Sequence, residues 1–173
     1  YLGASSGGTV SHIHDFVCGV DNHHGGQLVA VEISPRMVRD LVKLSDRRPG
    51  LVPVLGDARK PEQVAAFIRG KANWIHQDLS IADQAETFVK IATSFLVPGG
   101  IGILSLKAAS ERSSEGNDNT RFQKAERILM ESDLLLQERI SCHPHPQMAL
   151  AAQVVRRMGD QAQAMRGREG QRL

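Results

Sequence analysis

Two residues able to carry proton chemistry stand directly after two predicted strands. Asp78 follows the apolar stretch 72–76, and Lys107 follows the stretch 101–106 (IGILSL). Parallel strands end at one edge of their sheet, so this acid and this amine are expected near each other. A carboxylate can orient a hydroxyl or accept its proton, and an ammonium stabilises charge developing on the oxygen. The pair therefore predicts activation of a weakly acidic hydroxyl, with a structural salt bridge as the alternative.

A glycine-rich turn offers a place for a cofactor. Residues 1–9 read YLGASSGGT, a strand end that runs into a small-residue turn and then a helix. Small residues let the backbone approach a ligand, and free amides at a helix start favour polar or anionic groups. The glycines follow G-x-x-x-G-G and lack the G-x-G-x-x-G pyrophosphate fingerprint. The turn therefore favours S-adenosylmethionine (SAM), which has no pyrophosphate, over NAD.

Two acids close the next two predicted strands. Glu32 ends the stretch 27–33 (QLVAVEI), and Asp57 follows 51–55 (LVPVL). An acid closing the second strand is placed to accept hydrogen bonds from ribose hydroxyls, and Asp57 is placed for an adenine amino group. A solvated strand-end carboxylate is the alternative for Glu32. Together the first three strand ends fit an adenosine-bearing cofactor.

The remaining pattern predicts the elements that position these strand ends. Stretches with helical apolar spacing alternate with short apolar runs typical of buried parallel strands. Helices are predicted at 10–18, 35–47, 61–69, 83–97 and 120–132, and strands at 27–33, 51–55, 72–76, 101–106, 134–142 and 148–155. This βαβαβαβαβαββ order predicts an α/β, Rossmann-like methyltransferase fold. We expect a mostly parallel seven-stranded sheet with helices on both faces and a C-terminal antiparallel hairpin.

Composition fits one globular domain. The 173 residues are 41% hydrophobic and 23% charged, with a net charge of +2. We assign 1–156 to the domain and expect the polar stretch 157–173 to be a disordered tail. Two cysteines suit a reducing compartment, and no apolar run approaches the ~20 residues of a membrane span, so no membrane partner is expected. Because Tyr1 lies inside a predicted strand, we expect that strand to be truncated and upstream sequence to be missing.

Several stretches, in chain order, resemble the fibrillarin family, including archaeal fibrillarin-like rRNA/tRNA 2'-O-methyltransferases. They are 1–12 (YLGASSGGTVSH), 31–36 (VEISPR), 53–61 (PVLGDARKP), 77–78 (QD), 83–85 (DQA), 99–100 (GG) and 105–108 (SLKA). The Ser-Pro-Arg and Gly-Asp-Ala forms resemble archaeal members more than eukaryotic ones. We therefore expect a cytoplasmic protein, or a nucleolar one if the source is eukaryotic.

The resemblance implies SAM as methyl donor and methylation of a ribose 2'-hydroxyl in rRNA or tRNA. Family members work inside a box C/D ribonucleoprotein, in which a guide RNA chooses the target. The implied protein partners are a Nop-domain scaffold protein and a kink-turn-binding ribosomal-type protein. The sequence itself has few aromatic residues, 4%, and so few platforms for stacking single-stranded bases, which agrees with recognition delegated to a guide.

The resemblance also assigns residues. It places the cofactor against Gly3, Ala4, Gly7, Thr9, Glu32, Ile33, Asp57, Ala58, Asp78 and Gln84. Asp78 and Lys107 match two members of the family's catalytic Lys-Asp-Lys-His/Glu set, whose first Lys precedes the glycine turn and is not in this sequence. The family's last-strand Asp-His reads Pro-Gln at 146–147, and His145 could substitute with a local shift. Ala109 stands where a basic residue is usual.

Basic residues offer contacts to an RNA backbone. The candidates are Arg36, Arg39, Lys43 and Arg47 along one helix, and Arg59 and Lys60 after a strand. The first four recur every three or four residues, so they share a helix face. A merely solvated basic face is the competing interpretation.

Other functions fit less well. Residues 3–7 (GASSG) match the G-x-S-x-G of hydrolases, and Ser5, Asp78 and His143 or His145 would follow in the right chain order. However, the oxyanion-like HHGG at 23–26 follows the serine instead of preceding it.

The seven histidines give no zinc spacing, since His12 and His14 point to different helix faces, so no metal is expected. A non-enzymatic role competes more closely, because Gln147 replaces the family's histidine. The chain would then bind SAM and complete a ribonucleoprotein without turnover.

Overall fold

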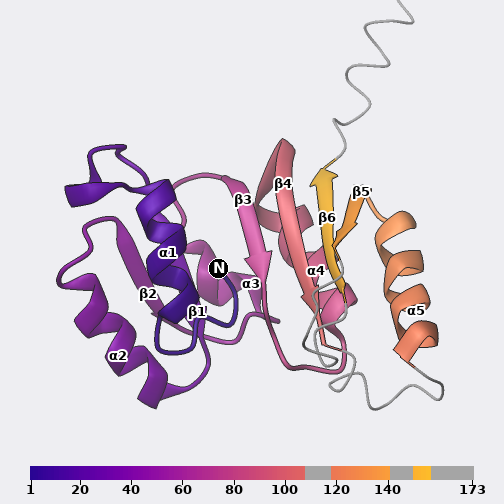
Figure 1. The fold of residues 1–173 in the computed structure, drawn as a ribbon, viewed down its shortest axis with the longest axis horizontal. Coiled ribbons are helices and arrows are strands. Elements are labelled where there is room, and N and C mark those ends of the chain that lie inside the picture. The colour runs from indigo at the N-terminus through magenta and orange to yellow at the C-terminus, as the bar shows by residue number, and fades with distance from the viewer. Residues whose placement is uncertain (108–117, 141–149, 157–173) are drawn as a thin grey trace, which may run out of the picture.

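The computed structural model describes residues 1–107, 118–140 and 150–156 (Figure 1). The helices are α1 (Gly8–Val17), the 3-10 turn η1 (Val20–Asn22), α2 (Pro35–Ser45), α3 (Pro61–Ala65), α4 (Gln84–Phe95) and α5 (Asp118–Met130). The strands are β1 (Leu28–Glu32), β2 (Leu51–Leu55), β3 (Ala72–Gln77), β4 (Leu96–Leu106), β5 (Leu134–Ile140) and β6 (Leu150–Arg156).

A single residue joins two sheets. β1 and β2 pair in parallel, while β3, β4, β6 and β5 form the second sheet in that order, with β6 antiparallel to both neighbours. Leu2 lies between the sheets and bridges in parallel to Val31 and to Gln77. The sequence predicted one seven-stranded sheet. In the described residues, the short segment around Leu2 stands where that sheet would have its first strand.

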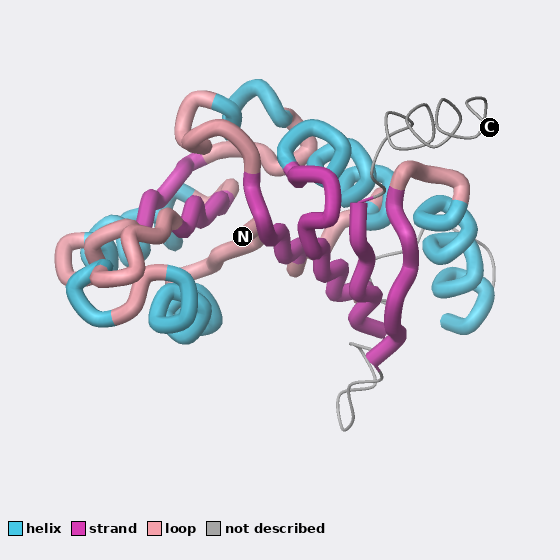
Figure 2. Tube along the Cα trace, turned by 90° about the horizontal axis from the view of Figure 1, so that it is seen from above, coloured by secondary structure: helices cyan, strands magenta, loops and turns pink. Residues whose placement is uncertain are grey.

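Helices cover both faces of this layer (Figure 2). On one face α1 and α2 pack on β1 and β2, around a core that includes Val10, Leu41 and Leu28. On the other face α4 packs on β3 and β4, and α5 packs on α4 and β5, around Phe88 and Leu129. Neighbouring residues of β1 face opposite cores, as expected for a parallel strand buried on both sides.

Some element boundaries differ from the predicted ones. Helix α3 ends at Ala65 instead of residue 69, and α5 lies two residues earlier than predicted. Helix α4 ends at Phe95 and β4 begins at once with Leu96, whose backbone is already extended. Pro98 disfavours helical geometry in the residue before it, so the helix ends ahead of the 98–100 segment, which belongs to β4. The predicted tail lies outside the described residues.

Candidate active site

The glycine turn wraps closely over the end of β3. Gly3 has φ +86°, and a Cβ built on it would stand 2.3 Å from the main-chain oxygen of Asp78. Gly7 has φ +100°, and a Cβ there would stand 2.6 Å from Leu44 of α2. A side chain at either position would meet both a disfavoured backbone conformation and a steric clash. The two glycines therefore allow the turn to sit against β3 and α2.

Glu32 fastens this turn to the start of α2. Its Oε2 accepts a hydrogen bond from the Ser5 amide at 2.8 Å, and its Oε1 accepts one from the Ser34 amide at 2.8 Å. Each carboxylate oxygen has a second lone pair, so the group retains capacity to accept from a ligand hydroxyl. Glu32 thus holds the glycine turn and the start of α2 in place while it remains able to accept a hydrogen bond from a ligand.

A small pocket of about 70 Å³ opens at the carboxyl ends of β1 and β2. It is lined by Gly3, Val31, Glu32, Ile33, Gly56, Asp57, Ala58, Arg59, Leu79 and Ile81. Five of the residues predicted to hold the cofactor therefore share one pocket. Leu79 and Ile81 were missed because they follow Asp78 in a loop, where no strand or helix pattern marks them. Their apolar side chains, with Ile33 and Ala58, give the pocket walls suited to a planar base.

Asp57 is paired within the pocket. The Arg59 guanidinium donates to both carboxylate oxygens at 2.8–3.1 Å, and the Arg59 amide donates to Oδ1 at 3.0 Å. This guanidinium holds the pKa of the Asp57 carboxyl below its ordinary value. The Arg59 side chain is 51% exposed and was predicted only as an RNA contact, whereas the structure makes it a wall of the pocket.

Asp78 and Lys107 come together as predicted. Lys107 Nζ lies 2.7 Å from Asp78 Oδ1, and both side chains are about one quarter exposed. The same Nζ lies 3.4 Å from the Ser80 hydroxyl. Among the described residues, Oδ1 is buried and receives no well-aligned hydrogen bond, so its contact with Lys107 is one of charge. A carboxylate has two oxygens, so Asp78 keeps a second acceptor besides the buried Oδ1.

Gln84 is bound to the backbone of Lys107. Its side chain is fully buried at the start of α4, with Nε2 donating to the Lys107 carbonyl at 3.1 Å. Its Oε1 accepts from the Lys107 amide at 2.9 Å, and its own carbonyl accepts from Gln77 at 2.7 Å. Gln84 therefore fixes the backbone that carries Lys107. The cofactor contact that the resemblance implied for Gln84 stays a prediction.

A buried polar cluster adjoins the ion pair on the same sheet face. His76 Nε2 lies 2.9 Å from the Ser105 hydroxyl, and the Tyr1 ring packs edge-on against His76 with ring centres 4.8 Å apart. Burial lowers the pKa of His76 to about 4. His76 is therefore neutral at pH 7, and the charges next to it belong to Asp78 and Lys107.

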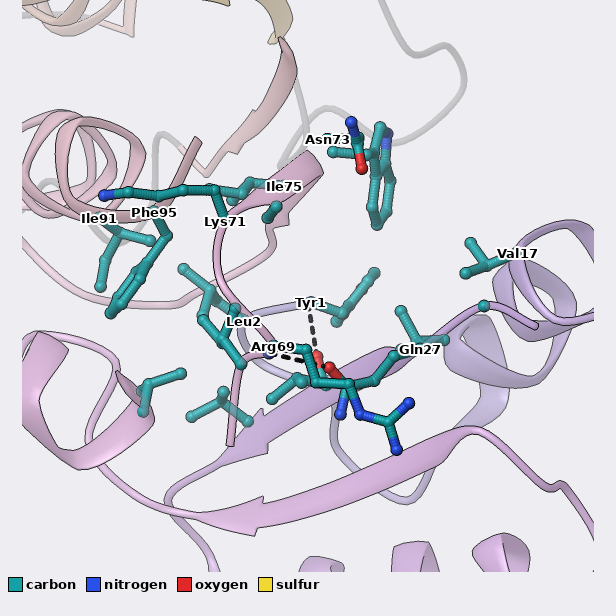
Figure 3. Close-up of a pocket in the computed structure, with 18 of the residues that line it drawn as sticks. Tyr1, Leu2, Val17, Gln27, Arg69, Lys71, Asn73, Ile75, Ile91 and Phe95 are labelled. Carbon is teal, nitrogen blue, oxygen red and sulfur yellow. Dashed lines mark hydrogen bonds between the residues drawn. The ribbon is translucent and has the colours of Figure 1, made fainter. Parts of the chain in front are cut away.

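A larger cavity of about 490 Å³ lies toward the opposite end of the strands (Figure 3). Gln27 and Asn73 line it just before β1 and at the start of β3, and Ile91 and Phe95 of α4 close its other side. Ligands of open α/β sheets bind at the carboxyl ends of the strands. We therefore assign the functional site to the small pocket and the ion pair.

The other predicted residues are more scattered. Ala4 is buried under the turn, and Thr9 is exposed in the first turn of α1. Arg36 and Arg39 are exposed on α2, and Lys60 is exposed before α3. His143, His145 and Gln147 lie outside the described residues.

The described residues also bear on metal and membrane binding. They contain no group of three or more His, Cys, Asp or Glu side chains arranged to hold a metal ion. None of the helices in this part of the chain has the length and apolar character needed to cross a bilayer.

Residues 1–157 match the family described as Fibrillarin. The chain belongs to the fibrillarin family. The match confirms the resemblance drawn from the sequence motifs, and it covers the glycine turn, the small pocket and the ion pair of this fibrillarin domain.

Individual fibrillarins agree with the match. A fibrillarin-like rRNA/tRNA 2'-O-methyltransferase from Methanococcus voltae is 35% identical over 144 residues, which are 83% of this chain and 60% of the relative. The solved fibrillarin/Nop5p complex has a TM-score of 0.77 at 28% identity, covering 90% of this chain and 70% of that one. Aeropyrum pernix fibrillarin in complex with natively bound SAM has a TM-score of 0.74 at 27% identity, covering 90% and 64%. The fibrillarin domain thus spans about 60% of the length of the curated relative.

Proposed function

We propose that this chain carries the SAM-dependent 2'-O-methylation of ribose in rRNA or tRNA. The observation that carries the proposal is the 2.7 Å contact between Asp78 and Lys107. Gly3 packs on the Asp78 backbone and also lines the small pocket with Glu32, so the glycine turn adjoins both the ion pair and the pocket. The names of the relatives and the SAM in the Aeropyrum pernix fibrillarin support it.

The pocket residues fit SAM. Glu32 would accept from the ribose hydroxyls, and Ile33, Ala58, Leu79 and Ile81 would enclose the adenine. Gly3 lets the turn lie directly against the Asp78 backbone, which keeps the pocket close to the ion pair. When bound, SAM supplies a methyl group on a sulfonium, ready for in-line attack by an oxygen.

Asp78 and Lys107 would prepare that oxygen. The Asp78 carboxylate would accept the hydrogen bond of the ribose 2'-hydroxyl and take its proton as the hydroxyl attacks. The Lys107 ammonium stabilises the negative charge that develops on the oxygen. Gln84 would hold the Lys107 backbone in place at the end of β4. Partial burial of Asp78 and Lys107 strengthens their electrostatic interactions with the hydroxyl.

The partners follow from the same assignment. We propose that a guide RNA of the box C/D class presents the substrate, and that a Nop-domain protein docks the enzyme, as the solved fibrillarin/Nop5p complex suggests. A kink-turn-binding protein would complete the particle. Arg36, Arg39 and Lys60 are exposed and would contact the RNA backbone by charge.

SAM binding tests this proposal before any assay of turnover. Calorimetry should show that Glu32→Gln weakens SAM binding about tenfold or more, because one charge-assisted acceptor for the ribose is lost. Glu131→Gln, an exposed acid at the end of α5, is the matched control and should bind SAM like the wild type. Unchanged affinity in Glu32→Gln, or no SAM binding by the wild type, would overturn the cofactor assignment.

A further inference from the structure

The backbone of Lys107 follows directly after the end of β4. Among the described residues, the pairing of β4 with β3 ends at Gln77 and Leu104, and β4 itself ends at Leu106. Beyond that point Gln84 takes the place of a neighbouring strand, because its side-chain amide binds both the N–H and the C=O of Lys107. The position of the Lys107 backbone therefore depends on what holds Gln84.

A second buried glutamine binds Gln84. Gln77 is the last residue of β3, and its fully buried side chain donates from Nε2 to the Gln84 carbonyl at 2.7 Å. Only the NH2 end of an amide can donate to a carbonyl, so this bond fixes the orientation of the Gln77 amide. A chain of hydrogen bonds thus runs from the end of β3, through the first residue of α4, to the backbone of Lys107.

Stability alone does not favour a glutamine at position 77. Gln77 Oε1 is buried and has no hydrogen-bond partner among the described residues, and such an unpaired oxygen destabilises a fold. The Gln84 carbonyl does not require Gln77 either, since a carbonyl in the first turn of a helix accepts from the amide four residues later. An apolar side chain of similar length would therefore suit the folded state at least as well.

We infer that Gln77 is a positioning residue that sets where Lys107 stands relative to Asp78. The inference rests on the proposed methyl transfer at that pair. Gln77 directly precedes Asp78 in the chain, so its bond to Gln84 ties the backbone beside the acid to the backbone that carries the amine. This tie supports the 2.7 Å contact between the two charged groups. Misplacement by about 1 Å is enough to slow a reaction that needs both groups at one oxygen.

The main experiment uses Gln77→Met, which keeps the length of the side chain and removes its amide. In the assembled particle we expect kcat to fall about three- to tenfold, with the SAM Kd unchanged. The melting temperature should stay the same or rise, because the unpaired oxygen is removed together with the bond. A purely structural residue would show the reverse, a lower melting temperature with an unchanged kcat, and that result would refute the positioning role. Gln123→Met, on the exposed surface of α5, is the matched control and should behave like the wild type.

A double substitution tests whether the two glutamines act as one chain. If Gln77 acts through Gln84, adding Gln77→Met to Gln84→Leu should lower kcat no further than Gln84→Leu does alone. Losses that multiply in the double variant would show that the two residues act independently, and would contradict the inference.

Hydrogen exchange of the Lys107 amide, followed by NMR, decides the matter without turnover. The bond to Gln84 Oε1 protects this amide, so it should exchange faster in Gln77→Met than in the wild type, although the variant is no less stable. Equal exchange in the two proteins would overturn the role of Gln77. A wild type that transfers no methyl group, but shows the expected difference in exchange, would count against the proposed function and support the chain of hydrogen bonds.

Discussion

The substitution Gln84→Leu separates two roles of Gln84, which are contact with the cofactor and support of the Lys107 backbone. The substitution keeps the size of the side chain and removes the amide that binds both the N–H and the C=O of Lys107. The resemblance implies that Gln84 lines the cofactor. The structure buries the side chain completely, and Gln84 is not one of the residues that line the small pocket.

The magnitude follows from the bonds lost. Two hydrogen bonds at 2.9 and 3.1 Å disappear, and two polar groups of the backbone lose their partner. At about 1–1.5 kcal/mol per bond the loss of unfolding free energy is about 2–3 kcal/mol. For a chain of this size, that lowers the melting temperature by about 5–10 °C. Lys107 then moves relative to Asp78, so the methyl transfer rate should fall about tenfold or more.

The assay compares SAM affinity by calorimetry with methyl transfer, both at a temperature where the variant is folded. We expect an unchanged SAM Kd and a reduced rate. Gln63→Leu is the matched control, because the Gln63 amide oxygen accepts from the Asp57 amide at 2.9 Å beside the pocket. That variant should weaken SAM binding. If Gln84→Leu weakens SAM binding as much as Gln63→Leu does, Gln84 is a cofactor ligand and our account of it is wrong.

Two further predictions concern stability. Gly3→Ala should destabilise the fold by at least ~1–2 kcal/mol, since it places a Cβ at positive φ and against the Asp78 oxygen. Gly8→Ala meets open space at the start of α1 and should be neutral or slightly stabilising in the same urea titration; equal effects of the two substitutions would contradict this packing. Burial lowers the pKa of His76 to about 4, so the unfolded chain binds the extra proton first as pH falls. Stability present above pH 6.5 should therefore be lost between pH 6.5 and 4, by up to about 3 kcal/mol, and His76→Gln should abolish this loss in urea titrations at each pH. A wild type and a variant with the same acid sensitivity would show that His76 is not its source.

Local sequence patterns predicted the strands and the residues that stand at their ends. The strand at 51–55 is found as predicted, because a short apolar run between turn signals has few other solutions. The ion pair of Asp78 and Lys107 was also predictable, because parallel strands bring their ends to one edge. In both cases the prediction depends on where apolar runs begin and end along the chain.

Contacts between distant segments were not predictable in this way. The burial of Gln84 depends on Lys107, which is far along the chain and reaches it only through β4. The pairing of Arg59 with Asp57 is local, two residues apart, but residue type alone cannot decide between this ion pair and a contact of Arg59 with RNA. Likewise, the extension of β4 back to Leu96 depends on pairing with Ala72 of β3, which outweighs the turn signal of 98–100.

The central claim is that the Asp78–Lys107 pair promotes the transfer of a methyl group from SAM to a ribose hydroxyl. The most direct test is methyl incorporation from labelled SAM into guide-matched RNA by the complete gene product assembled with its partners, comparing wild type with Lys107→Met. We predict robust transfer by the wild type, and at least a hundredfold loss in the variant with SAM affinity retained. Equal transfer by both proteins would contradict the account, and tight SAM binding with no transfer by the wild type would identify an assembly subunit instead.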